Sequence, residues 1–435
     1  MGIFEELKEI VGEENFSRRE EELLAYSRDS SFFQETPICV VRPRTCDEVA
    51  GIVRLASEKR VPIIPRGAGT NPCGEVVGKA IVLDLSGMNR IIEVNERDMY
   101  AVVEPGVVRD ELNRALERYG LFFPPDPASS RVATIGGMLA NNSSGLHAVK
   151  YGTTQDYVLA LEVVLPGGEV IETGTLARKS SSGYSLCRLF VGSEGTLGVI
   201  TRATLRLLPI PEHRETVAFT IDSLDELKGV QEAVMALLPA AFEFMDEICL
   251  RVLAEKKGLK VEGGSGIIAV EFDGVRGEAE ACAERLRGRF GEELGAGDIW
   301  EMRKTLVPSL ASYSDKSPLA VTEDIGVPVS KAPDAIRRVK EIYGEAGFEV
   351  AVYGHLGDGN LHMRVFGEPA PELEHAADEV YAYVIDAGGT ISSEHGIGRL
   401  RRRYMEAQHG PALELMKRIK QALDPMGIMN PGCML

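Results

Sequence analysis

The two halves of this chain differ in the pattern of their apolar and polar positions. The first half alternates short apolar segments with Gly-rich loops, and the second half follows a longer alternation of strands and helices. Residues 45–48 (TCDE) form a capping box, which predicts an amphipathic helix to about residue 59. The apolar run 61–65 that follows is typical of a buried strand. Further strands are predicted at 81–85, 91–94, 100–103 and 199–208, with a helix at 107–119.

Pro209 and Pro211 mark the predicted boundary between the halves, because two prolines close a strand ahead of a new pattern. Beyond them, a second capping box at 223–226 opens a helix to about residue 238. The later elements are helices at 246–257, 278–289 and 333–346 and strands at 267–272 and 320–327. We therefore expect an α+β layer, with helices on one face of an antiparallel sheet. The tail, 399–435, is predicted to be helical and to pack back on the first domain.

Composition narrows the class of protein. The 435 residues exceed one typical domain, and 44% hydrophobic and 26% charged residues are usual for a globular protein. A net charge of −18 argues against nucleic-acid binding, which requires a basic, clustered surface. No apolar stretch reaches the length of a membrane span, and the acidic start differs from a signal peptide. We therefore expect a cytoplasmic protein, with any membrane contact made through a partner.

The 7 cysteines are scattered and contain no C-x-x-C pair. This usage suits a reducing compartment. It also excludes an iron–sulfur cluster of the ferredoxin type, which needs closely spaced cysteines.

Two Gly-rich loops of the second half hold three of the chain's 7 histidines. The run GHLGDGNLH places His355 and His362 on either side of a turn, between apolar runs that alternate like strands. The later run SEHGIG adds Glu394 beside His395. Two neutral imidazoles and one carboxylate leave coordination positions open on a divalent metal, as a catalytic site requires. Each histidine by itself is better explained as a turn or core residue, but the combination predicts a metal site.

Three Gly-rich loops of the first half, at 66–74, 124–145 and 192–198, suit a backbone that approaches phosphates or a flat ring. A Rossmann fingerprint fits poorly, because the third Gly is missing and Pro72 blocks the required helix. No Walker loop occurs either. An amide loop with Arg66 and Thr70 nearby could hold a pyrophosphate, although such loops are more often simple turns.

Four segments of the first half resemble the FAD domain of the vanillyl-alcohol oxidase (PCMH-type) flavoproteins; they are 65–74, 124–127, 133–142 and 192–198. The histidine motifs resemble the C-terminal domain of the D-2-hydroxyacid dehydrogenase branch of that family. This branch includes the glycolate oxidase catalytic subunit, D-lactate dehydrogenase and D-2-hydroxyglutarate dehydrogenase. The resemblance implies a PCMH-type FAD domain of two subdomains, a ferredoxin-like α+β cap for substrate and metal, and a C-terminal helical segment. The corresponding ranges are 1–210, 211–398 and 399–435.

The resemblance also implies which residues contact FAD. They are Pro65, Arg66, Gly67, Ala68, Gly69, Thr70, Pro125, Asp126, Thr134, Gly137, Asn141, Glu194, Gly195 and Ile200. Many family members attach the flavin through a His in the first loop or a Cys in the second. Here Thr70 stands in the His neighbourhood and 126–145 contains no Cys, so we expect non-covalent FAD.

The family's reaction assigns roles to the second half. By resemblance, His355, His362 and Glu394 bind a divalent metal (Zn, alternatively Mn or Fe), and His395 is the general base. For His395, a fourth metal ligand or a turn residue are the alternatives. Arg303, in the run WEMR, would pair with the substrate carboxylate in a bidentate fork.

The expected function is oxidation of a small D-2-hydroxy acid, D-lactate or glycolate, to the 2-oxo acid. Val307 and Thr322 stand where relatives specific for 2-hydroxyglutarate carry polar or basic groups, although Arg364 could restore a second carboxylate anchor. The alternatives are a D-2-hydroxyglutarate-type dehydrogenase, an alkyl-glycerone-phosphate synthase and a non-catalytic flavin subunit of an electron-transfer complex. The expected partner is an electron acceptor, either an iron–sulfur subunit or an electron-transfer flavoprotein, with a quinone, a cytochrome or oxygen as further options. A homodimer is possible.

Overall fold

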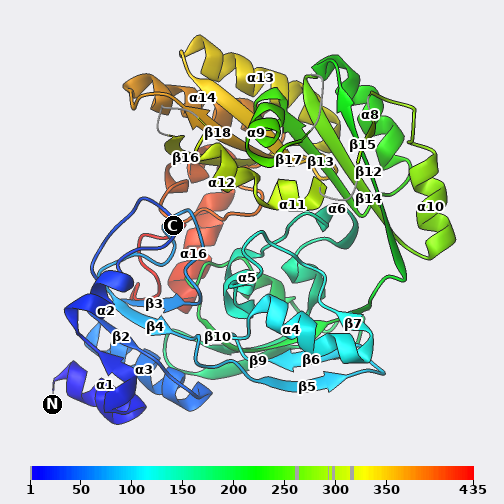
Figure 1. Cartoon of the computed structure of the whole chain (residues 1–435). Helices are drawn as coiled ribbons and strands as arrows, with labels where there is room; N and C mark the ends of the chain where they lie inside the picture. The colour runs from blue at the N-terminus through cyan, green and yellow to red at the C-terminus, as the bar shows by residue number, and fades with distance from the viewer. Residues whose placement is uncertain (1, 260–263, 292, 296–298, 314–317) are drawn as a thin grey trace. The chain divides into compact units, whose positions relative to one another are not determined.

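The computed structural model describes residues 2–259, 264–291, 293–295, 299–313 and 318–435, the stretch 318–322 by its backbone only. The chain forms two compact units (Figure 1). Unit 1 comprises Met1–Ser144, Thr153–Ile210 and Glu394–Leu435, and unit 2 comprises Gly145–Gly152 and Pro211–Ser393. The predicted domain ranges differ from these units at 145–152 and at 394–398, and as a functional division they stay a prediction.

Unit 1 begins with a four-stranded sheet in the order β1 (Phe16–Ser17), β2 (Cys39–Val41), β4 (Ile81–Asp84), β3 (Ile63–Arg66). Strands β2 and β3 both run parallel to β4, and α3 (Cys46–Lys59) is the crossover that connects β2 to β3. The Thr45 hydroxyl accepts a hydrogen bond from the Glu48 amide at 3.2 Å and so caps this helix. The reciprocal half of the predicted capping box differs, because the Glu48 carboxylate accepts from the Arg44 amide at 2.7 Å. Helix α3 buries Val49 and Val53 against the sheet, and α1 (Ile3–Val11) packs beside it.

The second sheet of unit 1 is antiparallel, in the order β5 (Ile91–Asn95), β6 (Tyr100–Val103), β10 (Val199–Arg206), β8 (Val158–Val164), β9 (Val170–Gly174). Helix α4 (Arg109–Leu116) is shorter than the predicted 107–119, since its last turn continues as a 3₁₀ helix at Glu117–Tyr119. The other elements are α2 (Glu20–Ala25), α5 (Ile135–Asn141), α7 (Leu186–Phe190) and the pair β7 (Leu121–Phe122) and β11 (Leu208–Pro209).

The C-terminal tail belongs to unit 1. It contains α15 (Met405–His409) and α16 (Ala412–Leu423), and its last residues then run along β3. The Ile63 amide donates to the Ile428 carbonyl, and the Asn430 amide donates to the Ile63 carbonyl, both at 2.8 Å. The tail therefore extends the first sheet beside the strand that leads into the first Gly-rich loop.

Unit 2 is built on a seven-stranded antiparallel sheet, in the order β15 (Glu293–Leu294), β12 (His213–Ile221), β14 (Gly266–Gly274), β13 (Ala241–Asp246), β17 (Glu349–His355), β18 (Asn360–Phe366), β16 (Pro318–Gly326). Its register pairs Glu243 with His355, and it pairs His362 with both Tyr353 and Asp324. Residues paired across antiparallel strands point to the same side of a sheet. One face therefore carries all five of these side chains.

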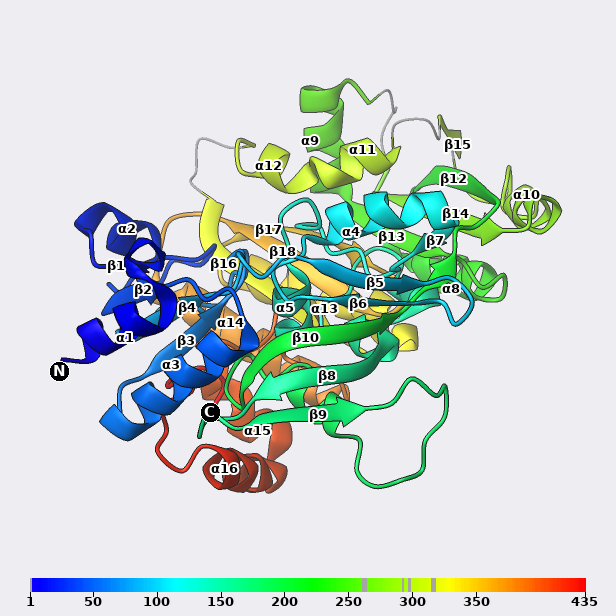
Figure 2. The same ribbon diagram turned by 90° about the horizontal axis from the view of Figure 1, so that it is seen from below.

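Helices cover both faces of this sheet, whereas the sequence predicted helices on one face. Three helices share an apolar cluster with Met245 and Tyr353; they are α9 (Glu247–Lys257), α11 (Ile299–Lys304) and α12 (Leu306–Leu310). Helices α13 (Ala332–Glu345) and α14 (Pro371–Asp386) lie on the other side of β17 and β18 (Figure 2). The remaining helices are α6 (Ala148–Tyr151), α8 (Leu227–Met235) and α10 (Arg276–Glu284). Over the described residues, no helix combines the length and apolar character needed to cross a membrane.

Candidate functional site

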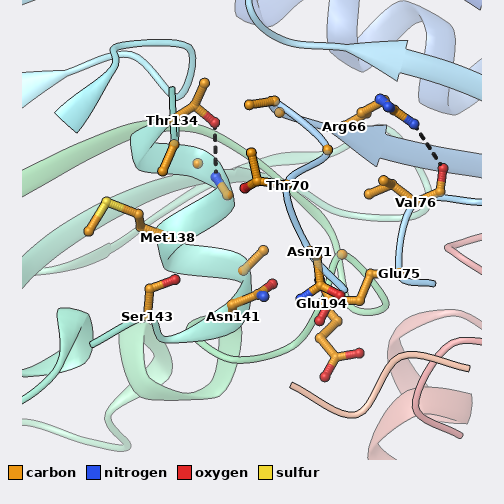
Figure 3. A pocket seen from close by; sticks show the side chains of 18 of the residues that line it. Arg66, Thr70, Asn71, Glu75, Val76, Thr134, Met138, Asn141, Ser143 and Glu194 are labelled. Carbon is orange, nitrogen blue, oxygen red and sulfur yellow. Dashed lines mark hydrogen bonds between the residues drawn. The ribbon is translucent and has the colours of Figure 1, made fainter. Parts of the chain in front are cut away.

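Unit 1 encloses a cavity of about 270 Å³ between its Gly-rich loops (Figure 3). The walls are the loop that follows β3, helix α5 and the segment before β10. Glu394 and His395 line it as well. All predicted FAD contacts line this cavity except Pro125 and Asp126. The Pro125 carbonyl instead accepts a hydrogen bond from Arg109 Nε at 2.8 Å.

Glycines allow two of these walls to approach each other. A Cβ on Gly67 would lie 2.3 Å from Thr134 Oγ1, a distance that no side chain tolerates. The same hydroxyl caps α5 by accepting from the Gly137 amide at 3.3 Å, as Figure 3 shows. Gly69 has a positive φ of 69°, and a Cβ there would meet the Arg66 guanidinium at 2.4 Å. The loop thus depends on glycine at both positions.

The Arg66 side chain stabilises this loop through hydrogen bonds to backbone carbonyl groups. Its buried guanidinium donates to the Arg28 carbonyl at 2.8 Å and to the Val76 carbonyl at 3.3 Å (Figure 3). It also lies over the Tyr26 ring, 5.2 Å from the centroid. Burial lowers the pKa of Arg66. Since these contacts engage the side chain with the protein itself, Arg66 shapes the loop, and its predicted contact with the FAD pyrophosphate stays a prediction.

A buried acidic cluster fixes the chain beside Glu394 and His395. The Glu194 carboxylate accepts hydrogen bonds from the amides of Ile397 and Gly398, at 2.7 and 2.9 Å, and from Cys433 Sγ at 3.1 Å. Burial, together with the nearby Glu194 charge, raises the pKa of Glu75 well above its ordinary value. These contacts hold the backbone after His395 in place.

Two further hydrogen bonds hold the predicted metal ligand Glu394 and the backbone of the predicted base His395 within unit 1. Asn71 Nδ2 donates to the His395 carbonyl at 2.6 Å, and Ser144 Oγ donates to Glu394 Oε2 at 3.2 Å. The His395 ring lies with Nε2 3.7 Å from Glu394 Oε1. Asn71 was absent from the sequence prediction, although it follows Thr70 directly in the first loop.

The two predicted histidine ligands come from the β17–β18 hairpin of unit 2. Their rings are perpendicular, with centroids 5.4 Å apart, and both side chains are buried. The turn is closed by the Gly359 amide, which donates to the His355 carbonyl at 3.1 Å. Gly359 has a φ of 81°, and a Cβ there would lie 2.0 Å from the Val327 carbonyl oxygen, so only glycine fits.

Glu243, which the sequence analysis missed, joins His355 to Arg303. Its Oε2 accepts from Arg303 Nε at 2.7 Å, and its Oε1 contacts His355 Nδ1. Burial would raise the pKa of Glu243, but its contacts with His355 and Arg303 lower it. The signal in the sequence was an acid flanked by two phenylalanines in the strand AFEFMD, since a buried carboxylate needs a partner.

Asp324 is a second missed residue on this sheet face. Its carboxylate accepts hydrogen bonds from Asn360 Nδ2 at 2.8 Å, Ser392 Oγ at 2.9 Å and the Ser393 amide at 3.1 Å. Asp324 Oδ1 also lies 3.7 Å from His362 Nδ1. The acid therefore orients the segment that leads directly into Glu394.

The donor set of unit 2 suits a divalent cation. The Glu243 carboxylate contacts His355 Nδ1, so Nε2 is the ring nitrogen that would bind the metal. Metal-bound histidines commonly donate their other ring nitrogen to a carboxylate in this way. His362 and the Asp324 carboxylate add a second imidazole and an oxygen donor nearby. Glu394 and His395 belong to unit 1, so the complete ligand set and the base stay a prediction.

Two family models match the chain. Residues 37–174 match the FAD binding domain, and residues 210–434 match the C-terminal domain of FAD linked oxidases. The glycolate oxidase subunit GlcD of Bacillus subtilis (strain 168) is 36% identical, over 99% of this chain and 96% of that protein. The mitochondrial D-lactate dehydrogenase [cytochrome] of Arabidopsis thaliana is 34% identical, over 99% of this chain and 79% of that protein.

A solved structure supports the same fold. The crystal structure of p-cresol methylhydroxylase with substrate bound superimposes with a TM-score of 0.79 at 17% identity, covering 99% of this chain and 95% of that one. At this identity the likeness shows the fold. Taken with the two domain matches and the glycine-lined cavity, it identifies the chain as a member of the FAD-linked oxidase family of PCMH-type flavoenzymes.

Proposed function

We propose that this protein oxidises a D-2-hydroxy acid to the 2-oxo acid, using non-covalent FAD and a divalent metal. The observation that carries the proposal is the contact that Glu243 makes with His355, on the same buried sheet face, and with Arg303 of helix α11. Through this contact, one carboxylate connects the proposed metal ligand His355 to Arg303, whose guanidinium can bind the carboxylate of a substrate. Two relatives that span almost the whole chain are named for glycolate oxidase and D-lactate dehydrogenase, which supports the same substrate class.

In this proposal, oxidation removes a hydride from Cα and a proton from the hydroxyl group. Bound FAD supplies a two-electron acceptor for the hydride, and a bound divalent cation (Zn, alternatively Mn or Fe) supplies Lewis acidity toward the hydroxyl oxygen. His355, His362 and Glu394 are the proposed metal ligands, and His395 Nε2 is the proposed acceptor of the hydroxyl proton. Arg303 would hold the substrate carboxylate and so fix the orientation of Cα.

A non-covalent flavin is proposed because Thr70 stands in the first loop and none of the 7 cysteines falls within 126–145. Acid denaturation should release the yellow chromophore into solution. A chromophore that remains with the precipitated protein would contradict this part of the proposal.

A small substrate side chain, as in D-lactate or glycolate, is the proposed preference. Val307 lies exposed on α12 and offers no polar group, and the side chain of Thr322 lies outside the described residues. Arg364 favours a second candidate, a D-2-hydroxydicarboxylate, because it lies two residues beyond His362 on β18 and so points to the same sheet face. Replacing Arg364 with Met separates the two, since only a dicarboxylate would lose affinity.

The electrons must leave the flavin for another molecule. No C-x-x-C pair exists in the chain, so we propose an iron–sulfur subunit or an electron-transfer flavoprotein as acceptor, with a quinone as the alternative. A cytoplasmic location and a homodimer belong to the same proposal.

The test is anaerobic reduction of the bound flavin by a panel of D- and L-2-hydroxy acids, with elemental analysis of the same sample. The proposal expects bleaching by D-lactate or glycolate and a bound transition metal near one equivalent. A flavin that no 2-hydroxy acid bleaches would favour a non-catalytic flavin subunit instead.

A further inference from the structure

We propose that Glu243 is a positioning residue that serves metal and substrate together. One carboxylate oxygen would fix His355 as a metal ligand, and the other would fix Arg303 as the clamp for the substrate carboxylate. This inference rests on the proposed function, and it adds a physical link between the two binding events.

The geometry around Glu243 uses both of its oxygens. The side chain lies on β13, is 0% exposed, and sits between Phe242 and Phe244 in the strand. Oε1 contacts His355 Nδ1, and Oε2 accepts from Arg303 Nε at 2.7 Å. A carboxylate only accepts hydrogen bonds, so the proton of a neutral His355 resides on Nδ1, and Nε2 is the ring nitrogen that carries the lone pair a cation would take.

The second oxygen acts on Arg303 in a parallel way. Because Nε is engaged with Glu243, the plane of the guanidinium is fixed and its two terminal nitrogens remain for a bidentate carboxylate. The guanidinium also lies over the Tyr353 ring, 5.2 Å from the centroid, which limits its rotation further. Tyr353 in turn packs against His362, with ring centroids 5.6 Å apart.

A fully buried carboxylate in an apolar strand is costly unless each oxygen is paired. Here the two partners are the predicted metal ligand His355 and the predicted substrate clamp Arg303, and both approach the same carboxylate. Any buried carboxylate needs a partner for each oxygen, so the identity of the two partners, rather than their number, indicates a positioning role. The pairing of both explains why an acid occupies this strand position.

Replacement of Glu243 with Gln tests the idea, because an amide offers one acceptor oxygen where two donors need one each. Arg303 Nε can only donate, whereas His355 can change tautomer. Arg303 therefore keeps the amide oxygen, and His355 Nδ1 accepts from the amide nitrogen, so that the His355 proton moves to Nε2, the metal-binding atom. We expect chelator-treated, FAD-loaded Glu243→Gln protein to bind Zn²⁺ about 10- to 100-fold more weakly than the parent protein. Binding is measured by competition with a chromogenic chelator, with FAD content and Tm recorded on each sample.

The matched control is Glu323→Gln. Glu323 is a buried acid of the same sheet, hydrogen-bonded to Tyr381, but it lies on β16 one residue before Asp324 and so faces the opposite side. The Zn²⁺ affinity of this variant should equal that of the parent protein. The double variant Glu243→Gln/Arg303→Met removes one of the two competing donors, so its Zn²⁺ affinity should recover, which a merely structural role would not produce.

The outcomes separate this inference from the proposed function. If the parent protein binds Zn²⁺ and Glu243→Gln binds it equally well, Glu243 does not position His355 and the inference fails, while the proposed function stands. If the double variant shows no recovery, the shared carboxylate is not the link. If neither the parent protein nor any variant binds Zn²⁺, Mn²⁺ or Fe²⁺, the metal-dependent function itself fails, and this inference fails with it. If Glu243→Gln does not fold, the double variant, which carries no buried charge at either position, provides the comparison.

Discussion

Replacing Arg303 with Lys should weaken binding of the hydroxy acid while leaving the protein folded. Lys keeps the positive charge but presents one ammonium group, whereas Arg303 donates through Nε to Glu243 and keeps two terminal nitrogens for the substrate. If the ammonium group of the variant pairs with Glu243, it cannot also form a two-pronged contact with a carboxylate. The variant therefore loses at least one charge-assisted hydrogen bond to the substrate.

A hydrogen bond to a charged group contributes about 1.5–3 kcal/mol. At about 1.4 kcal/mol for each factor of ten, its loss corresponds to a KM that rises roughly 10- to 150-fold. We expect kcat to fall less than kcat/KM, because the carboxylate is held in both the ground state and the transition state. The assay is steady-state oxidation of D-lactate with an artificial electron acceptor, with FAD content and Tm measured alongside.

Lys304→Met is the matched control for this prediction. Lys304 follows Arg303 in α11, but it is largely exposed and pairs with Glu301 at the helix surface. Its replacement should leave KM unchanged. An unchanged KM in Arg303→Lys as well would remove Arg303 from the substrate site and would refute the reasoning from its fixed guanidinium.

Three further predictions concern the cofactor loop and stability. Gly67→Ala should lose most bound FAD, because its Cβ would lie 2.3 Å from Thr134 Oγ1; Gly167→Ala, which meets no atom within 4 Å, is the control, and equal FAD content would contradict the prediction. Asp246→Ala should cost about 3 kcal/mol of unfolding free energy in urea titrations, since the carboxylate caps α9 and accepts from the Val352 amide at 2.8 Å and from Lys340 at 2.6 Å. A cost no larger than that of the exposed Asp225→Ala would argue against this role. Hydrogen bonds from Ser17 and Arg19 lower the pKa of Glu22 from 4.5 to about 2, so its stabilising effect is complete above pH 4.5 and is lost as pH falls toward 2. Glu22→Gln should accordingly lower Tm at pH 7 and lower it less at pH 3, and an equal difference at both would contradict the linkage.

Local patterns in the sequence predicted much of this molecule. The Thr45 hydroxyl caps a helix, and the turn after His355 forms a hairpin, because both depend on contacts only a few residues apart. The glycine loops that the sequence singled out line one cavity. Glycine is needed where two segments approach too closely for a Cβ atom, so it marks such positions in the sequence. The family resemblance supplied the assignment of FAD that the loops by themselves left open.

Contacts between distant segments were beyond the reach of these patterns. Glu243 meets His355 across 112 positions of sequence, and the pairing follows from strand order, which no local signal specifies. The same applies to Asn430, whose amide pairs with Ile63 at the edge of the first sheet. The helix at 246–257 and the helix at 333–346 were both predicted, but no local signal specified that α9 and α13 pack on opposite faces of the sheet.

The central claim is that the two histidines of the hairpin hold a cation that FAD-dependent oxidation requires. The most direct measurement is anaerobic mixing of D-lactate with one FAD-loaded preparation, divided into metal-stripped and Zn²⁺-restored halves, beside His355→Ala treated in the same way. The account predicts rapid flavin bleaching in the restored parent protein, and slow bleaching in the stripped parent protein and in both halves of His355→Ala. Equally rapid bleaching in the stripped parent protein, or full rescue of His355→Ala by Zn²⁺, would contradict it.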